Sequence, residues 1–218
     1  MDMDTARLIT GTGRKPKGMG PERREEILAH ALRLFSEHGV HTVSTRQIAG
    51  AVGISQPSLY AYFPTKQALV EEVCKRAFGA LTERMRAVIG QASGRDLMAT
   101  MGRAYVDFGL SQPDAYRVAF MIEVARPDGG LAQDPALMAG IEAYLLHREA
   151  VVKVMGGGLS EEAIDLLAQS QWASLHGLVS LLIARPTFPW VDRERLIEAH
   201  IDSLLPPPTA KPSRVSGT

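Results

Sequence analysis

The sequence predicts an all-α protein of about nine helices, in which a small amino-terminal module precedes a larger helical body. Apolar residues recur at the three- and four-residue spacing of helices along most of the chain, and no convincing strand alternation is visible. Glycine, proline and capping residues divide the chain into segments of helical length. Apolar residues make up 45% and charged residues 22% of the 218 residues, the balance of a folded globular protein.

The first helix is expected to begin at Pro21. Residues 1–20 are glycine-rich and without periodicity, and we expect them to form a flexible basic arm. Apolar positions with helical spacing then run from Ile27 to Phe35. Pro21 suits the first turn of a helix, and Gly39 provides the end.

Two short helices are expected between residues 44 and 63. Ser44 and Gln47 have the spacing of a capping box, and Gly53 breaks the first of these helices. Ser55 caps the second helix, which ends at Pro64. This order predicts a helix-turn-helix motif at 44–63 within a module at 21–66.

The remaining chain, residues 67–205, is predicted to form a helical regulatory domain. A long helix capped by Thr65 extends to about Ile89. Gly- and Pro-containing breaks separate five further helices, which we place at 95–110, 113–124, 135–155, 160–184 and 192–205. The proline-rich tail at 206–218 is expected to be disordered.

Charge and cysteine content narrow the classes of protein. The net charge is zero, yet nine basic and six acidic residues precede position 67, so the front of the chain is basic. This small charge asymmetry is consistent with an anion-binding module, and it is equally explained by chance. The single cysteine, Cys74, fits a reducing compartment. The sequence shows no run of about 18 apolar residues and no secretory signal. We therefore expect a cytoplasmic protein without membrane spans.

The second short helix of the motif carries the residue types of a DNA-reading surface. Leu59 and Phe63 are expected to anchor it, which leaves polar and aromatic side chains outward: Gln56, Ser58, Tyr60 and Tyr62. Such side chains suit phosphates, base edges and thymine methyl groups in a major groove. Simple solvent exposure is the alternative explanation of the same pattern.

The chain from Ile27 to Leu69 resembles the amino-terminal domain of TetR-family transcriptional regulators. The resemblance is carried by LFSEHG, the T-x-R-x-I-A-x-x-x-G core, SLYAYF and PTKQAL, in the family's order and spacing. It implies a DNA-binding regulator, most often a repressor, with a ligand-binding body that dimerises. WASLHG at 172–177 resembles, more weakly, the Trp…His-Gly signature of one class of TetR carboxy-terminal domain.

Family roles transfer to matching positions of this sequence. The resemblance implies DNA contacts by Thr45, Arg46, Gln56, Pro57, Ser58, Tyr60, Tyr62 and Lys66. Many relatives have glycine in place of Pro57 and an aromatic residue in place of Ala61, so a contact is lost at Ala61. The arm with Arg14, Lys15 and Lys17 is either a minor-groove contact or a solvated tail.

The resemblance also implies a homodimer formed by the last two helices. Two apolar stripes are the candidates, namely Ile164, Leu167, Gln171, Leu175, Leu178 and Leu182, and then Leu196, Ile197, His200, Ile201 and Leu204. These stripes are equally suited to face the protein's own core. A dimer that places two recognition helices in successive major grooves, roughly 34–36 Å apart, requires a palindromic operator.

A small-molecule site is expected inside the helical body. Aromatic and flexible apolar residues with a few polar tips suit such a cavity: Met101, Tyr105, Phe108, Tyr116, Phe120, Met121, Trp172 and His176. Each of these residues is also a plausible core residue, and His176 in particular suits a buried hydrogen bond.

Two classes of protein remain as alternatives to a DNA-binding regulator. One is a helical enzyme, and the other is a protein-interaction module that does not bind DNA. No G-x-S-x-G, H-E-x-x-H or phosphate-loop motif is present, so we expect no catalytic site and no cofactor. His38 and His41 lack a nearby third ligand, so they are expected to be solvated and not to bind metal. Cys74 is expected to be a packing residue.

Overall fold

The computed structural model describes residues 20–121, 135–155 and 158–207, and within these ranges every regular element is a helix. The predicted all-α class is therefore confirmed. The predicted basic arm lies almost entirely outside the described residues, and so does most of the predicted tail.

The amino-terminal module consists of α1 (Gly20–His38), α2 (Thr45–Val52), α3 (Gln56–Tyr60) and the first turns of α4 (Lys66–Ile89). Its core contains buried side chains from all four helices, including Ile27, Phe35, Ile48, Leu59 and Leu69. Arg24 and Glu25 of α1 pair with Glu72 and Arg76 of α4, which fixes the module to the long helix. Because α4 is continuous, it joins the module rigidly to the body.

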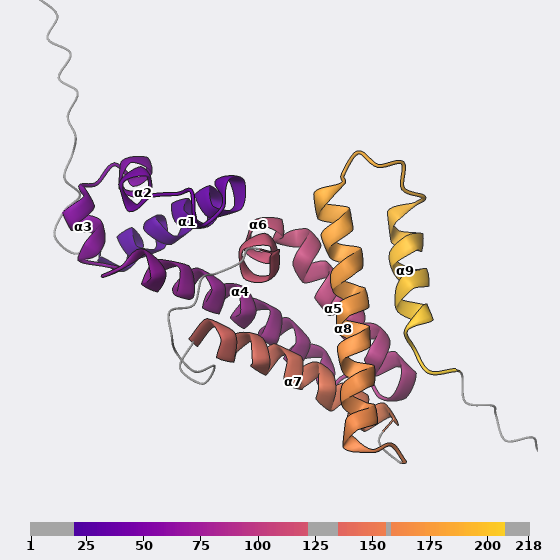
Figure 1. The fold of residues 1–218 in the computed structure, drawn as a ribbon. Helices are drawn as coiled ribbons and strands as arrows, with labels where there is room; N and C mark the ends of the chain where they lie inside the picture. Colours follow the sequence, from indigo (N-terminus) through magenta and orange to yellow (C-terminus); the bar gives the residue numbers. More distant parts are fainter. Residues whose placement is uncertain (1–19, 122–134, 156–157, 208–218) are drawn as a thin grey trace, which may run out of the picture.

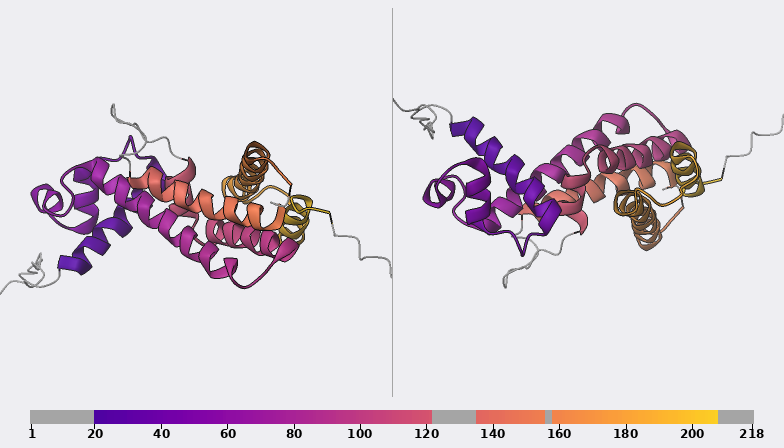
Figure 2. Two further views of the ribbon diagram at one scale, coloured as in Figure 1. Left: turned by 90° about the horizontal axis from the view of Figure 1, so that it is seen from below. Right: turned by 90° about the horizontal axis from the view of Figure 1, so that it is seen from above.

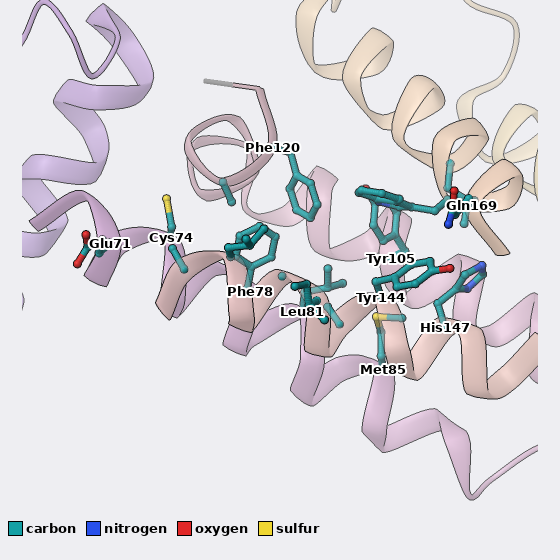
Figure 3. Close-up of a pocket in the computed structure, with 18 of the residues that line it drawn as sticks. Glu71, Cys74, Phe78, Leu81, Met85, Tyr105, Phe120, Tyr144, His147 and Gln169 are labelled. Carbon is teal, nitrogen blue, oxygen red and sulfur yellow. The ribbon is translucent and has the colours of Figure 1, made fainter. Parts of the chain in front are cut away.

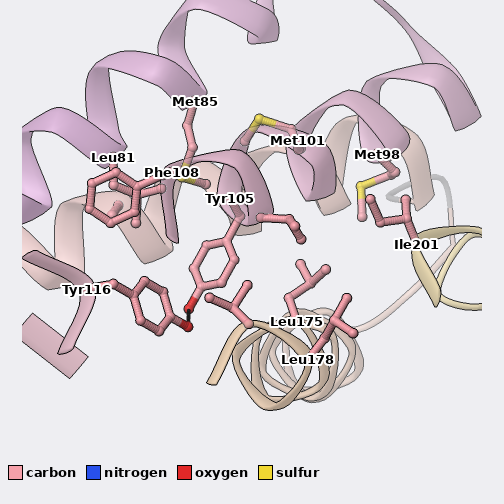
Figure 4. Close-up of a cluster of buried hydrophobic side chains, with 14 of the residues drawn as sticks. Leu81, Met85, Met98, Met101, Tyr105, Phe108, Tyr116, Leu175, Leu178 and Ile201 are labelled. Carbon is pink, nitrogen blue, oxygen red and sulfur yellow. Dashed lines mark hydrogen bonds between the residues drawn. The ribbon is translucent and has the colours of Figure 1, made fainter. Parts of the chain in front are cut away.

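The body follows as α5 (Gly94–Ser111), α6 (Pro113–Tyr116), a π-helical turn η1 (Arg117–Met121), α7 (Pro135–Met155), α8 (Glu161–Ala184) and α9 (Arg193–Ser203). Its core gathers side chains from α4, α5, α8 and α9, among them Leu81, Met101, Leu175 and Ile201 (Figure 4). Figures 1 and 2 show α2 and α3 at one end of the molecule and α8 and α9 toward the other.

The helix predicted at 113–124 differs from the observed structure. One α-helical turn is followed by the π-helical turn η1, and residues 122–124 lie outside the described ranges. Apolar spacing over so few residues cannot distinguish α-helical from π-helical bonding. In η1, Val118 packs in the core of the amino-terminal module, whereas Phe120 packs against the core of the body.

Candidate DNA-binding surface and ligand cavity

Local sequence signals fix the geometry of the helix-turn-helix. The Ser44 side chain accepts from the Gln47 backbone N–H, and the Gln47 side chain accepts from the Ser44 backbone N–H, so the capping box at α2 is complete. Gly53 ends α2 with a φ of 71°, in the left-handed region that glycine adopts without strain. The Ser55 hydroxyl then accepts from the Ser58 backbone N–H and caps α3.

Three of the predicted DNA-contacting side chains form a hydrogen-bonded cluster between α2 and α3. The Gln56 side-chain amide donates to Thr45 Oγ1 over 2.9 Å and to Tyr60 Oη over 3.3 Å. Thr45 Oγ1 and Tyr60 Oη lie 3.1 Å apart, and these bonds to Thr45 and then Gln56 lower the pKa of Tyr60. Thr45 is only 8% exposed whereas Tyr60 is 42% exposed, so Thr45 anchors a cluster that Tyr60 presents to solvent.

The other predicted DNA-contacting residues lie around this cluster. Arg46, Pro57 and Ser58 are exposed, and Ser58 Oγ is 2.8 Å from Ser55 Oγ. Tyr62 is half-buried and packs against the core of the module. Lys66 is half-buried at the first position of α4. The exposed side of the motif is thus formed mainly by Arg46, Pro57, Ser58 and Tyr60.

A cavity of about 430 Å³ lies between the helices of the body. Three residues predicted for a ligand site line it: Tyr105, Phe120 and Trp172. Sequence analysis missed the contributions of α4 and α7, which include Phe78, Leu81, Met85, Gly140, Tyr144 and His147 (Figure 3). The sequence signal that indicates this part of the cavity is the pair Tyr144 and His147, because residues three apart lie on the same side of a predicted helix.

The other five residues predicted for a ligand site do not line this cavity. Met101 and Phe108 are fully buried in the core of the body, and Met121 is exposed. Tyr116 Oη lies 2.9 Å from Tyr105 Oη and 2.7 Å from His176 Nδ1, and His176 Nε2 lies 3.2 Å from Ser180 Oγ. His176 is therefore half-buried and hydrogen-bonded within the protein, and burial lowers its pKa.

One end of the cavity contains the polar side chains of Tyr144 and His147. Tyr144 Oη is buried without a hydrogen-bond partner. Burial lowers the pKa of His147 from 6.5 to about 4, although hydrogen bonding to the Gln171 side chain and the Ala168 backbone acts in the opposite direction. The imidazole is therefore neutral at pH 7. Figure 3 shows the Tyr144 hydroxyl directed toward His147, with Glu71 and Cys74 at the opposite end.

The cavity adjoins the amino-terminal module through α4 and η1. Cys74 lines the cavity and is buried, with its Sγ 3.9 Å from the Val118 carbonyl oxygen. Phe120 lines the cavity two residues after Val118, which packs in the core of the module. Ser36 of α1 donates to Asp114 Oδ1 of α6 over 2.7 Å. These contacts join the cavity wall to the helices that support α2 and α3.

The apolar stripe predicted on α8 faces the subunit's own core. Five of its six members are buried, and Gln171 donates to the Leu204 carbonyl oxygen of the neighbouring segment. On α9, Ile197 and Ile201 are also buried. A different side of α8 is exposed and includes Leu166 (70% exposed), Ala173 and Leu181 (52% exposed).

Within the described ranges, no group of three or more His, Cys, Asp or Glu residues is arranged to hold a metal ion. His38 and His41 are exposed. None of the helices in those ranges combines the length and apolarity needed to cross a bilayer.

Comparison with known proteins identifies relatives for both parts of the chain. YerO of Bacillus subtilis (strain 168), an HTH-type transcriptional regulator, is 22% identical over 166 residues, covering 74% of this chain and 56% of YerO. The HTH-type transcriptional repressor KstR2 of Rhodococcus jostii (strain RHA1) is 38% identical over 79 residues, covering 36% of this chain and 38% of KstR2. The chain thus spans little more than half the length of YerO and less of KstR2.

A solved structure shares the fold along most of the chain. The putative regulatory protein SCO4313 superposes with a TM-score of 0.72 at 24% identity, covering 88% of this chain and all of that one. The described helices form a helix-turn-helix domain followed by a larger helical body. The chain belongs to the TetR family: residues 27–73 match the bacterial regulatory proteins of the tetR family, and residues 98–204 match a tetracyclin repressor-like C-terminal domain.

Proposed function

We propose that this TetR-family regulator is a cytoplasmic repressor that binds a palindromic operator as a homodimer and is released by a small molecule in the cavity. The observation that carries this proposal is the placement of a capped helix-turn-helix and an apolar cavity on the same continuous helix, α4. KstR2, which aligns with part of this chain, is described as a repressor.

In the proposed complex, α3 enters the major groove. Gln56, Pro57 and Ser58 lie at the start of α3, the part of a recognition helix that meets base edges. Arg46 and Lys66 supply positive charge beside it, and Tyr60 supplies a hydroxyl for a phosphate. Thr45 holds the cluster in place through Gln56 and Tyr60.

The proposed dimer forms through the exposed faces of α8 and α9. Helical spacing places Leu166, Ala173 and Leu181 on one side of α8, and large apolar side chains exposed on a surface favour association. Phe188 and Val191, in the connection to α9, are exposed as well. A symmetric pair of α8 helices would bury this apolar face twice.

Release is proposed to act through α4 and η1. A ligand that displaces Phe120 or Phe78 moves a turn and a helix that also carry core residues of the amino-terminal module, Val118 and Val73. A ligand shifts DNA binding only by its preference for one of two states of the dimer. The proposal requires that the preferred state no longer matches the operator spacing.

Selection of bound sequences from a random duplex library tests this function. The expected product is a palindrome bound with an affinity that falls steeply as salt rises, because phosphate contacts release counterions. A compound panel then seeks release of the protein from the selected duplex. Failure to enrich any sequence, with no retention on duplex DNA at low salt, would contradict the proposal.

A further inference from the structure

The wall of the cavity restricts the charge of any molecule that it encloses. Its middle is apolar and aromatic, with Phe78, Leu81, Met85 and Phe120 among the lining side chains. Within the described part of the chain, the lining includes no lysine or arginine, and its one acidic side chain is Glu71. A carboxylate or phosphate in this space would lose hydration without gaining a cationic partner, which is costly.

An unpaired polar atom belongs to a side chain at one end of the same cavity. Tyr144 lines the cavity, and its Oη is buried without a hydrogen-bond partner. Buried polar groups in proteins almost always have partners, so an unpaired hydroxyl on a cavity-lining residue favours a guest that supplies one. The phenol both donates and accepts.

We propose that the cavity binds a neutral, mainly apolar molecule whose single oxygen function, an alcohol or a ketone, pairs with Tyr144 Oη. The apolar part then lies along Phe78 and Leu81 toward Cys74 (Figure 3). The volume of about 430 Å³ suits one such molecule. This inference rests on the proposed function in using the same cavity for the effector, although binding itself requires no DNA.

Matched probes test the charge requirement. Decanol, decanone and decanoate share one alkyl chain and differ in the polar end. Trp172 lines the cavity, so its fluorescence reports occupancy once the other tryptophan is removed by Trp190→Phe. At pH 7 we expect decanol and decanone to bind at least about tenfold more tightly than decanoate, because the carboxylate finds no cation. Equal or tighter binding of decanoate, or no binding of any probe, overturns the proposal.

Tyr144→Phe tests the polar end. Removing the hydroxyl should weaken decanol binding by about threefold to tenfold, the range for one hydrogen bond. The free energy of unfolding should stay unchanged or rise, because an unpaired buried hydroxyl is lost.

Thr82→Val is the matched control. Thr82 Oγ1 is also buried and unpaired, but Thr82 does not line the cavity, so its removal should leave probe affinity unchanged. Equal decanol affinity in wild type and Tyr144→Phe overturns the assignment of the polar end. Probe binding as expected without release of the operator would leave this inference intact and contradict the proposed release.

Discussion

At the residue scale, the proposed DNA-binding surface combines a buried anchor with exposed side chains. Thr45, Gln56 and Tyr60 hold one another across the turn between α2 and α3. The amide nitrogen of Gln56 donates to both other members of this cluster, and its side-chain oxygen is a group that can accept from a base. The cluster thus links α3 to α2 through side-chain hydrogen bonds.

Gln56→Ala is predicted to change which sequences are preferred. The loss removes a base contact and loosens the link from Thr45 to Tyr60, so discrimination at the contacted position should fall by about 1–3 kcal/mol. Lys66→Ala should instead weaken binding to all duplexes equally, because phosphate contacts carry no sequence information. Selected-sequence profiles and affinities of both variants check this. An altered base preference in Lys66→Ala without an overall loss would contradict the division.

His147 is predicted to make stability depend on pH. Its pKa is about 4 in the folded protein and near 6.5 in the unfolded chain, so the unfolded chain binds the proton more readily. The contribution to stability is complete above pH 6.5 and is lost as pH falls toward 4, by about 3 kcal/mol at most. Denaturant unfolding at several pH values measures it.

The control for this pH dependence is the exposed His38. His147→Phe should flatten the decline between pH 6.5 and 4, whereas His38→Gln should retain it. If the free energy of unfolding of His147→Phe declined as in the wild type, the pH dependence would belong to other titratable groups.

At the element scale, the turn of the helix-turn-helix depends on Gly53. Its φ of 71° is strained for any side chain with a Cβ, although the space around it is open. Gly53→Ala should therefore lower the free energy of unfolding by about 1–2 kcal/mol. Gly50→Ala is the matched control, because Gly50 is helical, equally open and expected to gain helix propensity. Denaturant unfolding curves check both, and equal stability of the two variants would contradict the role of the turn.

The segment from α6 to η1 is predicted to couple the cavity to the DNA-binding module. Ser36→Ala removes the hydrogen bond to Asp114 between α1 and α6. We expect ligand affinity in the absence of DNA to remain at the wild-type value, while the ligand-induced loss of operator affinity shrinks severalfold. Paired titrations with and without operator measure this coupling. An undiminished coupling would exclude this contact as part of the path.

The accuracy with which the sequence predicted each helix depends on the capping and breaking residues at its ends. Helices bounded by caps and breakers were placed closely: α4, α7 and α8 begin and end within a residue of the predictions. The π-helical turn η1 was missed because apolar spacing does not report the bonding pattern. Phe78 and Tyr144 were missed as cavity residues because a helix's inward face looks the same whether it meets packed side chains or a space.

At the scale of the whole molecule, dimerisation is predicted to depend on the exposed side of α8. Leu181→Arg places a charge on this face and should give a monomer of unchanged fold, with operator affinity reduced by more than about tenfold, since two half-sites are no longer joined. Leu145→Arg, on α7, is the matched control because Leu145 is 53% exposed and Leu181 is 52% exposed. Sedimentation and operator binding check both variants. A dimeric Leu181→Arg protein would contradict this interface.

The exposed fractions of side chains on α8 show why the sequence alone does not identify the proposed dimer face. Leu175 and Leu181 are identical residues on one helix, yet one is buried in the subunit and the other is half exposed. Periodicity identifies an apolar side of a helix but not whether the covering surface belongs to the same chain or to a second copy. Only the three-dimensional packing of α5 and α7 against α8 separates the two sides.

The most direct measurement is the mass of the complex formed with the selected operator, determined by sedimentation at low salt. The account predicts two chains on each palindrome and dissociation of the complex as salt rises. One chain on each operator, or material that stays free of every duplex, would contradict the claim that paired subunits present α3 to DNA.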